Sequence, residues 1–574
     1  MRFSGSFLNR RSRFYQSQKR PISLIEIGLC SIWLLLISLM VTENSFPQEN
    51  RFDVTQQISI KNIKKHISIL ASDSLLGRGT GTDGARITAG YISEQLKNYG
   101  IKPFGNNGGY YQQIPLHGSY ALPQSLLTIH TDSEKHELNL GDDYILLKHG
   151  EKTLISKPVD MVFAGYGISA PEFDYNDYQS IDVEGKIVLV FGGEPYSQNQ
   201  KYFAGENNTI YSYPEAKHRL AIARGARGVL VIPNPFSFNE TNWKRLNDEL
   251  SFEDVSLPST TSSNFLAYIH PRVANKIFSA SGYNLDDLIE NHYKNKLKSF
   301  PLKVNISFKG VFKEREFLSS NVIGLISGND KKFEKTYLVL SAHYDHLGIG
   351  SAVNGDSIYN GLTDNALGVA VLLELSRLLK LSNLKRSVIV LFVTGEEKGL
   401  LGSQYFVDNS PVPVSSIVTN LNIDGVAFID KFKDVIGLGS EYSDLNKILL
   451  KIASPNNIEV SQIPNVFEQV ESFYKSDQLS FAKAGIPSIN IIDAPHYENY
   501  SEEESILMIR DYFENIYHSP FDDLNQKLNW EAILQHTKIL FDFSIEVTNS
   551  EKEPEWNDDS PFMNIRLRSK YLKK

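Results

Sequence analysis

The run YLVLSAHYDH, residues 337–346, decides the fold. Residues 337–342 are almost entirely apolar, and two histidines and an aspartate follow within four positions. A strand that is buried on both faces has such a continuous apolar run, because neither face alternates with solvent. The segment therefore predicts a buried strand that ends in ionisable side chains.

Three more apolar runs of this kind follow, at residues 387–394, 417–423 and 488–492, and an amphipathic helix is expected at 366–379. Fully buried strands that alternate with helices are typical of a mainly parallel sheet covered by helices on both faces. The sequence therefore predicts an α/β fold for this half of the chain.

Acidic and histidine side chains fall repeatedly at the carboxyl ends of these strands or at the start of a helix. The set comprises His343, Asp364, Glu396, Glu397, Asp424 and His518. Each residue alone is a weak signal, since a lone histidine is usually structural and an aspartate before a helix is usually an N-cap. Ligands of open α/β sheets collect beyond the carboxyl ends of the strands. The joint occurrence at one edge therefore predicts a metal site.

The chain has 574 residues and one cysteine, Cys30, which lies in the apolar N-terminal stretch. One cysteine excludes an intramolecular disulfide and a cysteine-rich zinc site. If the N-terminal stretch is cleaved or membrane-buried, thiol catalysis and iron–sulfur clusters are excluded as well. A metal must then be held by His, Asp and Glu, a donor set that suits zinc.

These residues stand in stretches that resemble the co-catalytic zinc aminopeptidase family, which includes bacterial leucyl aminopeptidases, aminopeptidase Y and, more distantly, glutamate carboxypeptidase II. The resembling stretches are SAHYD (341–345), TDNALGVA (363–370), GEEKGLLGS (395–403), NID (422–424) and YHSPFD (517–522), with accessory stretches within 70–81 and 474–487. The resemblance covers about residues 58–548.

The resemblance implies a site for two zinc ions. Asp364 is similar to the carboxylate that bridges both ions in the family. His343 and Asp424 resemble the two other ligands of one ion, and Glu397 and His518 those of the second. Each ion then keeps an open position for a shared water, as a catalytic zinc site requires.

The resemblance also implies roles for two neighbouring acids. Glu396 resembles the general base that takes a proton from the dizinc-activated water and returns it to the leaving amine. Asp345 is expected to accept a hydrogen bond from the imidazole of His343 and so to fix its tautomer.

Further expectations concern residues around this site. Family members carry a non-proline cis bond at the position of Asp364–Asn365. His346 and His496 are interpreted as surface or pocket-wall residues. Gln478 stands where many bacterial relatives have histidine, and with the residues after Asp424 it is expected to line the approach to the site.

The middle of the chain changes to short β-rich runs and resembles a protease-associated domain inserted into the peptidase. In the family this domain lies over or beside the cleft, where it can restrict entry of substrates. The expected parts are a first peptidase part at 58–120, the insertion at 121–312, the catalytic part at 313–548 and a polar, frayed tail at 549–574; within the insertion, 234–257 is expected to be loop-rich.

The N-terminus predicts export. The first 25 residues contain six basic side chains and no acid, and the apolar run at 27–41 follows, a pattern of export signals. Residues 1–45 are therefore expected to be a signal peptide or a membrane anchor, which places the protein in the periplasm, outside the cell or on the membrane facing outward. Without those six, 52 basic residues stand against 67 acidic ones, which disfavours nucleic-acid binding.

The favoured function is an exported zinc aminopeptidase acting on peptides. A carboxypeptidase or dipeptidase is the alternative, and it needs basic side chains for a substrate carboxylate, for which Arg78 and Lys475 are the candidates. A one-zinc glutaminyl cyclase and an inactive receptor-like protein are disfavoured, because all five ligands and Glu396 are present. The oligomeric state and the preferred side chain stay open.

Overall fold

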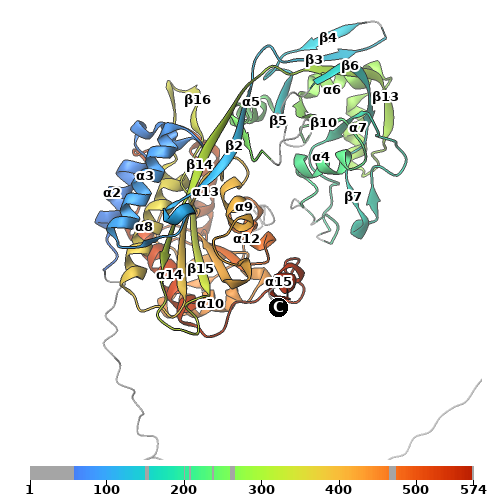
Figure 1. Ribbon diagram of the computed structural model, residues 1–574. Helices are drawn as coiled ribbons and strands as arrows, with labels where there is room; N and C mark the ends of the chain where they lie inside the picture. The colour runs from blue at the N-terminus through green and yellow to red at the C-terminus, as the bar shows by residue number, and fades with distance from the viewer. Residues whose placement is uncertain are drawn as a thin grey trace, which may run out of the picture. The chain divides into compact units, whose positions relative to one another are not determined.

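A computed structural model describes residues 57–571 apart from 133, 149–153, 200, 204, 206–208, 235–237, 259–264 and 464–472. The predicted export segment at 1–45, with Cys30, lies outside the described residues. Val54–Lys574 form one compact unit, which contains two large sheets (Figure 1). No helix within the described ranges is both long and apolar enough to cross a membrane.

The larger sheet has a parallel centre of four strands. Their order is β18 (Ser387–Val393), β15 (Tyr337–His343), β19 (Ile417–Asn422) and β22 (Ser488–Asp493). Antiparallel strands flank this centre, namely β2 (Tyr111–Ala121), β14 (Phe312–Ile326) and β20 (Asp434–Leu438), with the short β1 (Lys102–Pro103), β11 (Asp254–Ser256) and β21 (Glu459–Val460) at the margins. The predicted α/β fold is confirmed, and the parallel arrangement holds for the centre of a sheet that is mixed as a whole.

Alternate residues of the central strands pack on opposite faces of this sheet, as the pleat requires. Leu338 and Leu340 of β15 belong to one apolar core, and Val339 belongs to another. The first core contains α2 (Ile60–Leu70), α3 (Asp83–Asn98), α8 (Leu367–Leu381), α10 (Leu445–Ala453) and α14 (Trp530–Asn549); the second contains α9 (Leu401–Asp408) and α12 (Gln478–Lys483). Helices therefore cover both faces.

The second sheet belongs to the insertion and has a parallel centre of its own. Its order is β4 (Lys135–Leu138), β3 (Leu126–His130), β13 (Phe300–Lys309), β6 (Leu154–Phe163), β9 (Ile187–Phe191), β10 (Gly228–Ile232), β12 (Phe265–Ile269) and β5 (Tyr144–Lys148). Three helices accompany it, α4 (Pro214–Ile222), α6 (Pro271–Ala280) and α7 (Leu285–Tyr293). The small pairs β7 (Ser169–Ala170) with β8 (Tyr175–Asn176) and β16 (Gly348–Val353) with β17 (Asp356–Tyr359) stand apart from both sheets.

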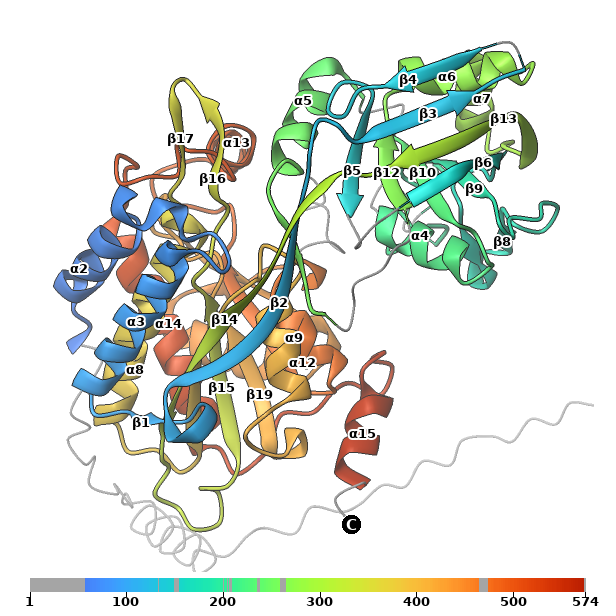
Figure 2. The same cartoon turned by 45° about the horizontal axis from the view of Figure 1, so that its top comes forward.

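The chain enters and leaves the insertion through two long neighbouring strands. β2 pairs with β14 along the whole length of β2, from Tyr111 opposite Val322 to Ala121 opposite Phe312, and both views show the two strands running side by side toward the second sheet (Figures 1 and 2). Beyond the strands, the Leu122 amide donates to the Val311 carbonyl over 2.8 Å. The connection is thus a hydrogen-bonded ribbon.

The segment expected to be a loop at 234–257 is instead partly regular. Asn239 caps the helix α5 (Glu240–Glu249), and β11 follows. β11 pairs with β2, with Val255 opposite Gly118. The loop interpretation was wrong because the segment is rich in polar residues, whereas its few apolar ones, among them Trp243 and Val255, are buried.

The tail after residue 549 also departs from the expectation of a frayed polar end. Trp556 and Phe562 are buried in a small apolar cluster with Phe473, and the Trp556 indole donates to the Gly485 carbonyl over 2.9 Å. The helix α15 (Met563–Tyr571) follows. Two aromatic anchors are enough to order a stretch whose composition is otherwise polar.

A buried histidine makes the stability of this fold dependent on pH. His536 on α14 is fully buried, accepts a hydrogen bond from the Ala427 amide and faces the Ile491 carbonyl. Burial lowers its pKa from 6.5 to about 4. The unfolded chain therefore binds a proton that the folded chain refuses, so stability present above pH 6.5 is lost as the pH falls toward 4.

We expect this residue to remove about 2 kcal/mol of unfolding free energy between pH 7 and pH 5. The measurement is urea unfolding at both pH values for the wild type and His536→Gln. The variant should be less stable at pH 7 and should show a pH-dependent loss smaller by about that amount. An equal pH-dependent loss in both proteins would contradict the assignment.

Candidate metal centre

The parallel strands bring their ionisable ends to one edge of the larger sheet. His343, the last residue of β15, stands opposite Val393 at the end of β18. Ser341 stands opposite Asn422, the last residue of β19. The loops that follow β18 and β19 therefore carry Glu396, Glu397 and Asp424 to the edge where His343 ends its strand, as the sequence predicts for a parallel sheet.

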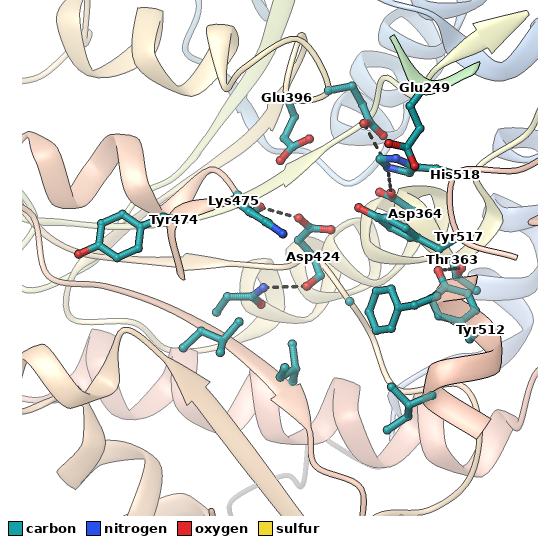
Figure 3. A pocket seen from close by; sticks show the side chains of 18 of the residues that line it. Glu249, Thr363, Asp364, Glu396, Asp424, Tyr474, Lys475, Tyr512, Tyr517 and His518 are labelled. Carbon is teal, nitrogen blue, oxygen red and sulfur yellow. Dashed lines mark hydrogen bonds and ion pairs between the residues drawn. The ribbon is translucent and has the colours of Figure 1, made fainter. Parts of the chain in front are cut away.

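Asp364 lies between two histidines. It belongs to the turn Leu362–Ala366 that leads into α8. One carboxylate oxygen, Oδ1, is 3.1 Å from Nε2 of His343. The other, Oδ2, is 3.1 Å from Nε2 of His518, a contact that Figure 3 shows. Asp424 Oδ1 is 3.3 Å from the same His343 nitrogen, and Glu397 Oε2 is 3.4 Å from the same His518 nitrogen. The five residues thus form two halves that share Asp364.

The donor atoms fit zinc. Ligand atoms of His343, Asp364 and Asp424 lie within 4.8 Å of one another, and so do those of His346, Asp364 and Glu397. Imidazole nitrogens and carboxylate oxygens are established zinc donors, and a site with few protein ligands on each ion leaves a position for substrate or water. The arrangement can therefore hold one ion in each half, with Asp364 available to both.

Asp522 fixes the turn that carries Asp364. Its fully buried carboxylate accepts hydrogen bonds from the amides of Thr363 and Asp364, at 3.0 and 3.1 Å, and from the Thr363 hydroxyl. The peptide bond between Asp364 and Asn365 is cis, as the resemblance implied. Asp522 is the last residue of the YHSPFD stretch, and its residue type alone does not indicate this role.

Asp345 acts on a different partner from the one expected. Nδ1 of His343 faces the backbone carbonyl of Asp345 at 3.1 Å, rather than its carboxylate. The carboxylate instead accepts from the Thr80 hydroxyl at 2.7 Å and from the Glu396 amide at 3.3 Å. The carbonyl contact still leaves Nε2 of His343 directed at the metal centre, and the carboxylate orients the backbone of Glu396.

The interpretation of His346 as a surface or wall residue was wrong. Its side chain is fully buried, and Nδ1 lies 2.7 Å from Oε1 of Glu397. His346 therefore orients Glu397 or adds a donor to its half of the site. His496 instead is partly exposed and pairs with Asp434. Gln478 is buried and accepts from Asn422, so it does not line the approach to the site.

Arg78 is committed to the backbone. The guanidinium is buried and donates to the carbonyls of Leu70, Tyr344, Asn360 and Gly361 over 2.5 to 2.9 Å. These contacts join the N-terminal part of the chain to the loops after β15 and β17. Arg78 is therefore not available to hold the carboxylate of a substrate.

Neighbouring groups divide the carboxyls of the site into two kinds. Burial, reinforced by the charges of Asp424 and Glu397, raises the pKa of Glu396 well above its usual range, although His343 opposes the shift. Burial acts the same way on Asp364, but hydrogen bonds from His343 and His518 outweigh it and hold its pKa well below the usual range. Such a separation of the pKa values of two neighbouring carboxyls is typical of a site with one proton-carrying acid and permanently ionised ligands.

The site opens into a cavity of about 1380 Å³. Its apolar lining includes Val426 and Phe428, which follow Asp424 in the chain, and Ile436 and Ile492, which are paired across β20 and β22. Lys398, the residue after Glu397, and residues of the α5–β11 segment of the insertion also line it. The cavity is therefore lined by residues next to both halves of the metal centre.

Comparison with known proteins agrees with this geometry. Residues 321–544 match the sequence model of Peptidase family M28. A probable zinc metalloprotease of Pyricularia oryzae is 33% identical over 104 residues, which are 18% of this chain and 20% of that protein. Aminopeptidase YwaD of Bacillus subtilis is 24% identical over 245 residues, which are 41% of this chain and 46% of that protein. Each match thus spans less than half of the curated relative.

The fold is shared over a longer stretch. The structure of an aminopeptidase from Aneurinibacillus sp. strain AM-1 is similar over 86% of this chain and 95% of its own, with a TM-score of 0.53 and 19% sequence identity. The predicted zinc aminopeptidase-like α/β fold is therefore confirmed, and the predicted family resemblance is confirmed for residues 321–544.

Proposed function

We propose that this protein is an exported aminopeptidase with two zinc ions, starting from the match of residues 321–544 to Peptidase family M28. The observation that carries the proposal is the position of Asp364, with one oxygen 3.1 Å from His343 and the other 3.1 Å from His518. A carboxylate that faces two separate sets of donors suits two neighbouring metal ions.

When bound, zinc supplies Lewis-acid activation of water and of the peptide carbonyl. The protein supplies the proton transfers. Glu396 lines the cavity beside the ligands, and its carboxylate can take a proton from the attacking water and return it to the leaving amine. Having taken the proton from water, the same carboxyl then acts as the acid in this second step.

Two features support attack at the amino end of a peptide. The carboxylates of Glu396 and Asp424 line the cavity at the metal centre, a surrounding that suits an ammonium group. Of the two basic residues considered for a carboxypeptidase, Arg78 is bound to carbonyls, whereas Lys475 lines the cavity. The carboxypeptidase alternative therefore rests on one lysine.

The experiment compares hydrolysis of Leu-norleucine, of its N-acetylated form and of its C-terminal amide. We expect zinc-dependent hydrolysis of the free and amidated peptides and at least a hundredfold lower kcat/KM for the acetylated one, since the block removes the ammonium charge. Cleavage of the acetylated peptide with loss of the amidated one would overturn the proposal in favour of a carboxypeptidase.

A further inference from the structure

Part of the insertion is bound firmly to the larger sheet. We call residues 240–256, α5 with β11, the strap. β11 extends the larger sheet by pairing with β2. Next to it, Arg315 of β14 donates through two nitrogens to the carboxylate of Glu253, with Nε to Oε1 at 2.6 Å, and a further nitrogen donates to the Gly81 carbonyl. A bidentate, partly buried ion pair of this kind holds geometry better than an exposed one.

An aromatic contact fixes the strap close to the metal ligands. Phe252 is buried and meets the ring of Tyr359 edge-on, with centroids 5.1 Å apart. Gly350 makes room for it, because a Cβ there would lie 2.4 Å from the Phe252 ring. Nζ of Lys398, the residue after the ligand Glu397, lies 5.5 Å from the ring centroid. The strap therefore borders the half of the site that contains Glu397.

Glu249 is placed at the metal centre by this attachment. It is the last residue of α5, three positions before Phe252, and it lines the same cavity as His518. Figure 3 shows it beside His518, and its charge is among those acting on that histidine. Its side chain is 44% exposed, and its ion pair with Arg245 is long, at 3.9 Å. Such a pair is weak, so the carboxylate can exchange it for a ligand.

Glu249 and the apolar lining residues lie next to different halves of the metal centre. Val426 and Phe428 follow Asp424 in the chain and suit the side chain of an N-terminal residue, whereas Glu249 lies beside His518. A dipeptide that places its first side chain next to Asp424 can extend its second residue toward His518 and the strap. The cavity lining that includes the strap contains the acids Glu215, Glu249, Glu253 and Asp254 and the bases Arg245 and Lys398.

We propose that Glu249, contributed by the insertion, selects peptides with a cationic residue directly after the cleaved bond. This proposal rests on the proposed aminopeptidase function. Glu253 is held by Arg315, whereas Glu249 lies beside His518 and its ion pair with Arg245 is long, so its carboxylate can pair with a lysine or arginine side chain of the substrate. Charge complementarity in a cleft gives specificity between substrates more than it gives overall affinity.

The test compares kcat/KM for Leu-Lys, Leu-norleucine and Leu-Glu, which differ in charge at the second residue. The wild type should prefer Leu-Lys over Leu-norleucine by about two- to fivefold, the range of a partly exposed charge pair. Glu249→Gln should abolish this ratio and leave Leu-norleucine within about twofold of the wild type. Glu249→Lys should reverse the order in favour of Leu-Glu.

Two control variants distinguish the position of the Glu249 carboxylate from a general effect of negative charge on the strap. Asp248→Asn removes the same charge one residue away, outside the cavity lining, and should keep the preference for Leu-Lys. Arg315→Gln releases the strap and should weaken the preference. An unchanged ratio in Glu249→Gln, or an equal loss on all three peptides, would overturn the inference.

A preference that moves to Lys-Leu would likewise contradict it, since the contact would then be with the first residue. Absence of zinc-dependent hydrolysis of Leu-norleucine in the wild type is a separate outcome, which would refute the proposed function itself.

Discussion

Replacing Glu396 with glutamine is expected to lower kcat/KM for Leu-norleucine by about 10²–10⁴-fold, the usual contribution of general acid–base catalysis. The amide keeps the size and the hydrogen-bonding capacity of the side chain but cannot accept the proton of the attacking water. Among the described contacts, His343 and His518 bond to Asp424 and Asp364, and not to the Glu396 side chain. The variant should therefore keep the zinc content of the wild type.

The measurement is steady-state kinetics combined with zinc analysis of the same samples. Glu514→Gln is the matched control, because this exposed glutamate also lines the cavity but lies on α13 (Glu502–Asn515), away from the strand ends. The control should stay within about twofold of the wild type, as exposed substitutions usually do. A Glu396→Gln enzyme of near wild-type activity with full zinc content would show that another group carries the proton.

Replacing Asp364 with alanine is expected to remove both zinc ions together. Its two oxygens face His343 and His518 separately, so the substitution takes one donor from each half of the centre. Loss of an outer hydrogen-bond partner already lowers metal affinity by about 10–100-fold, and loss of a ligand shared by two ions should exceed this. Activity should fall with the metal, to less than a hundredth of the wild-type kcat/KM.

Zinc affinity measured by competition with a chelator checks this expectation. Asp356→Asn, at the exposed first residue of β17, provides the control and should bind zinc as the wild type does. Circular dichroism at equal concentration establishes that the Asp364→Ala chain is folded. A folded variant that still retains one ion at wild-type affinity would mean that Asp364 serves a single half of the site.

The parts that the sequence predicted well depend on short-range patterns. The apolar runs at 337–342 and 387–394 became β15 and β18, because a continuous apolar run has few alternatives to a doubly buried strand. The positions of His343 and Asp424 then followed from the parallel arrangement, since each lies at or just beyond a carboxyl end of neighbouring strands.

The parts of the structure that the sequence did not predict depend on contacts between residues far apart in the chain. β11 pairs with β2 across more than 130 positions of sequence, and its three residues carry no pattern that distinguishes a strand from a loop. His346 is buried because Glu397, brought from another strand, faces it. Whether His343 contacts the carboxylate or the carbonyl of Asp345 depends on how the chain turns after β15. The residue types alone do not determine that turn.

The central claim, a centre of two zinc ions that serves hydrolysis, is tested most directly by titrating metal-depleted wild-type protein with zinc while following cleavage of Leu-norleucine. The account predicts no activity without zinc and a rise that reaches its maximum at two ions per chain. Full activity of the metal-depleted protein, or a maximum at one ion per chain with no further binding, would contradict it.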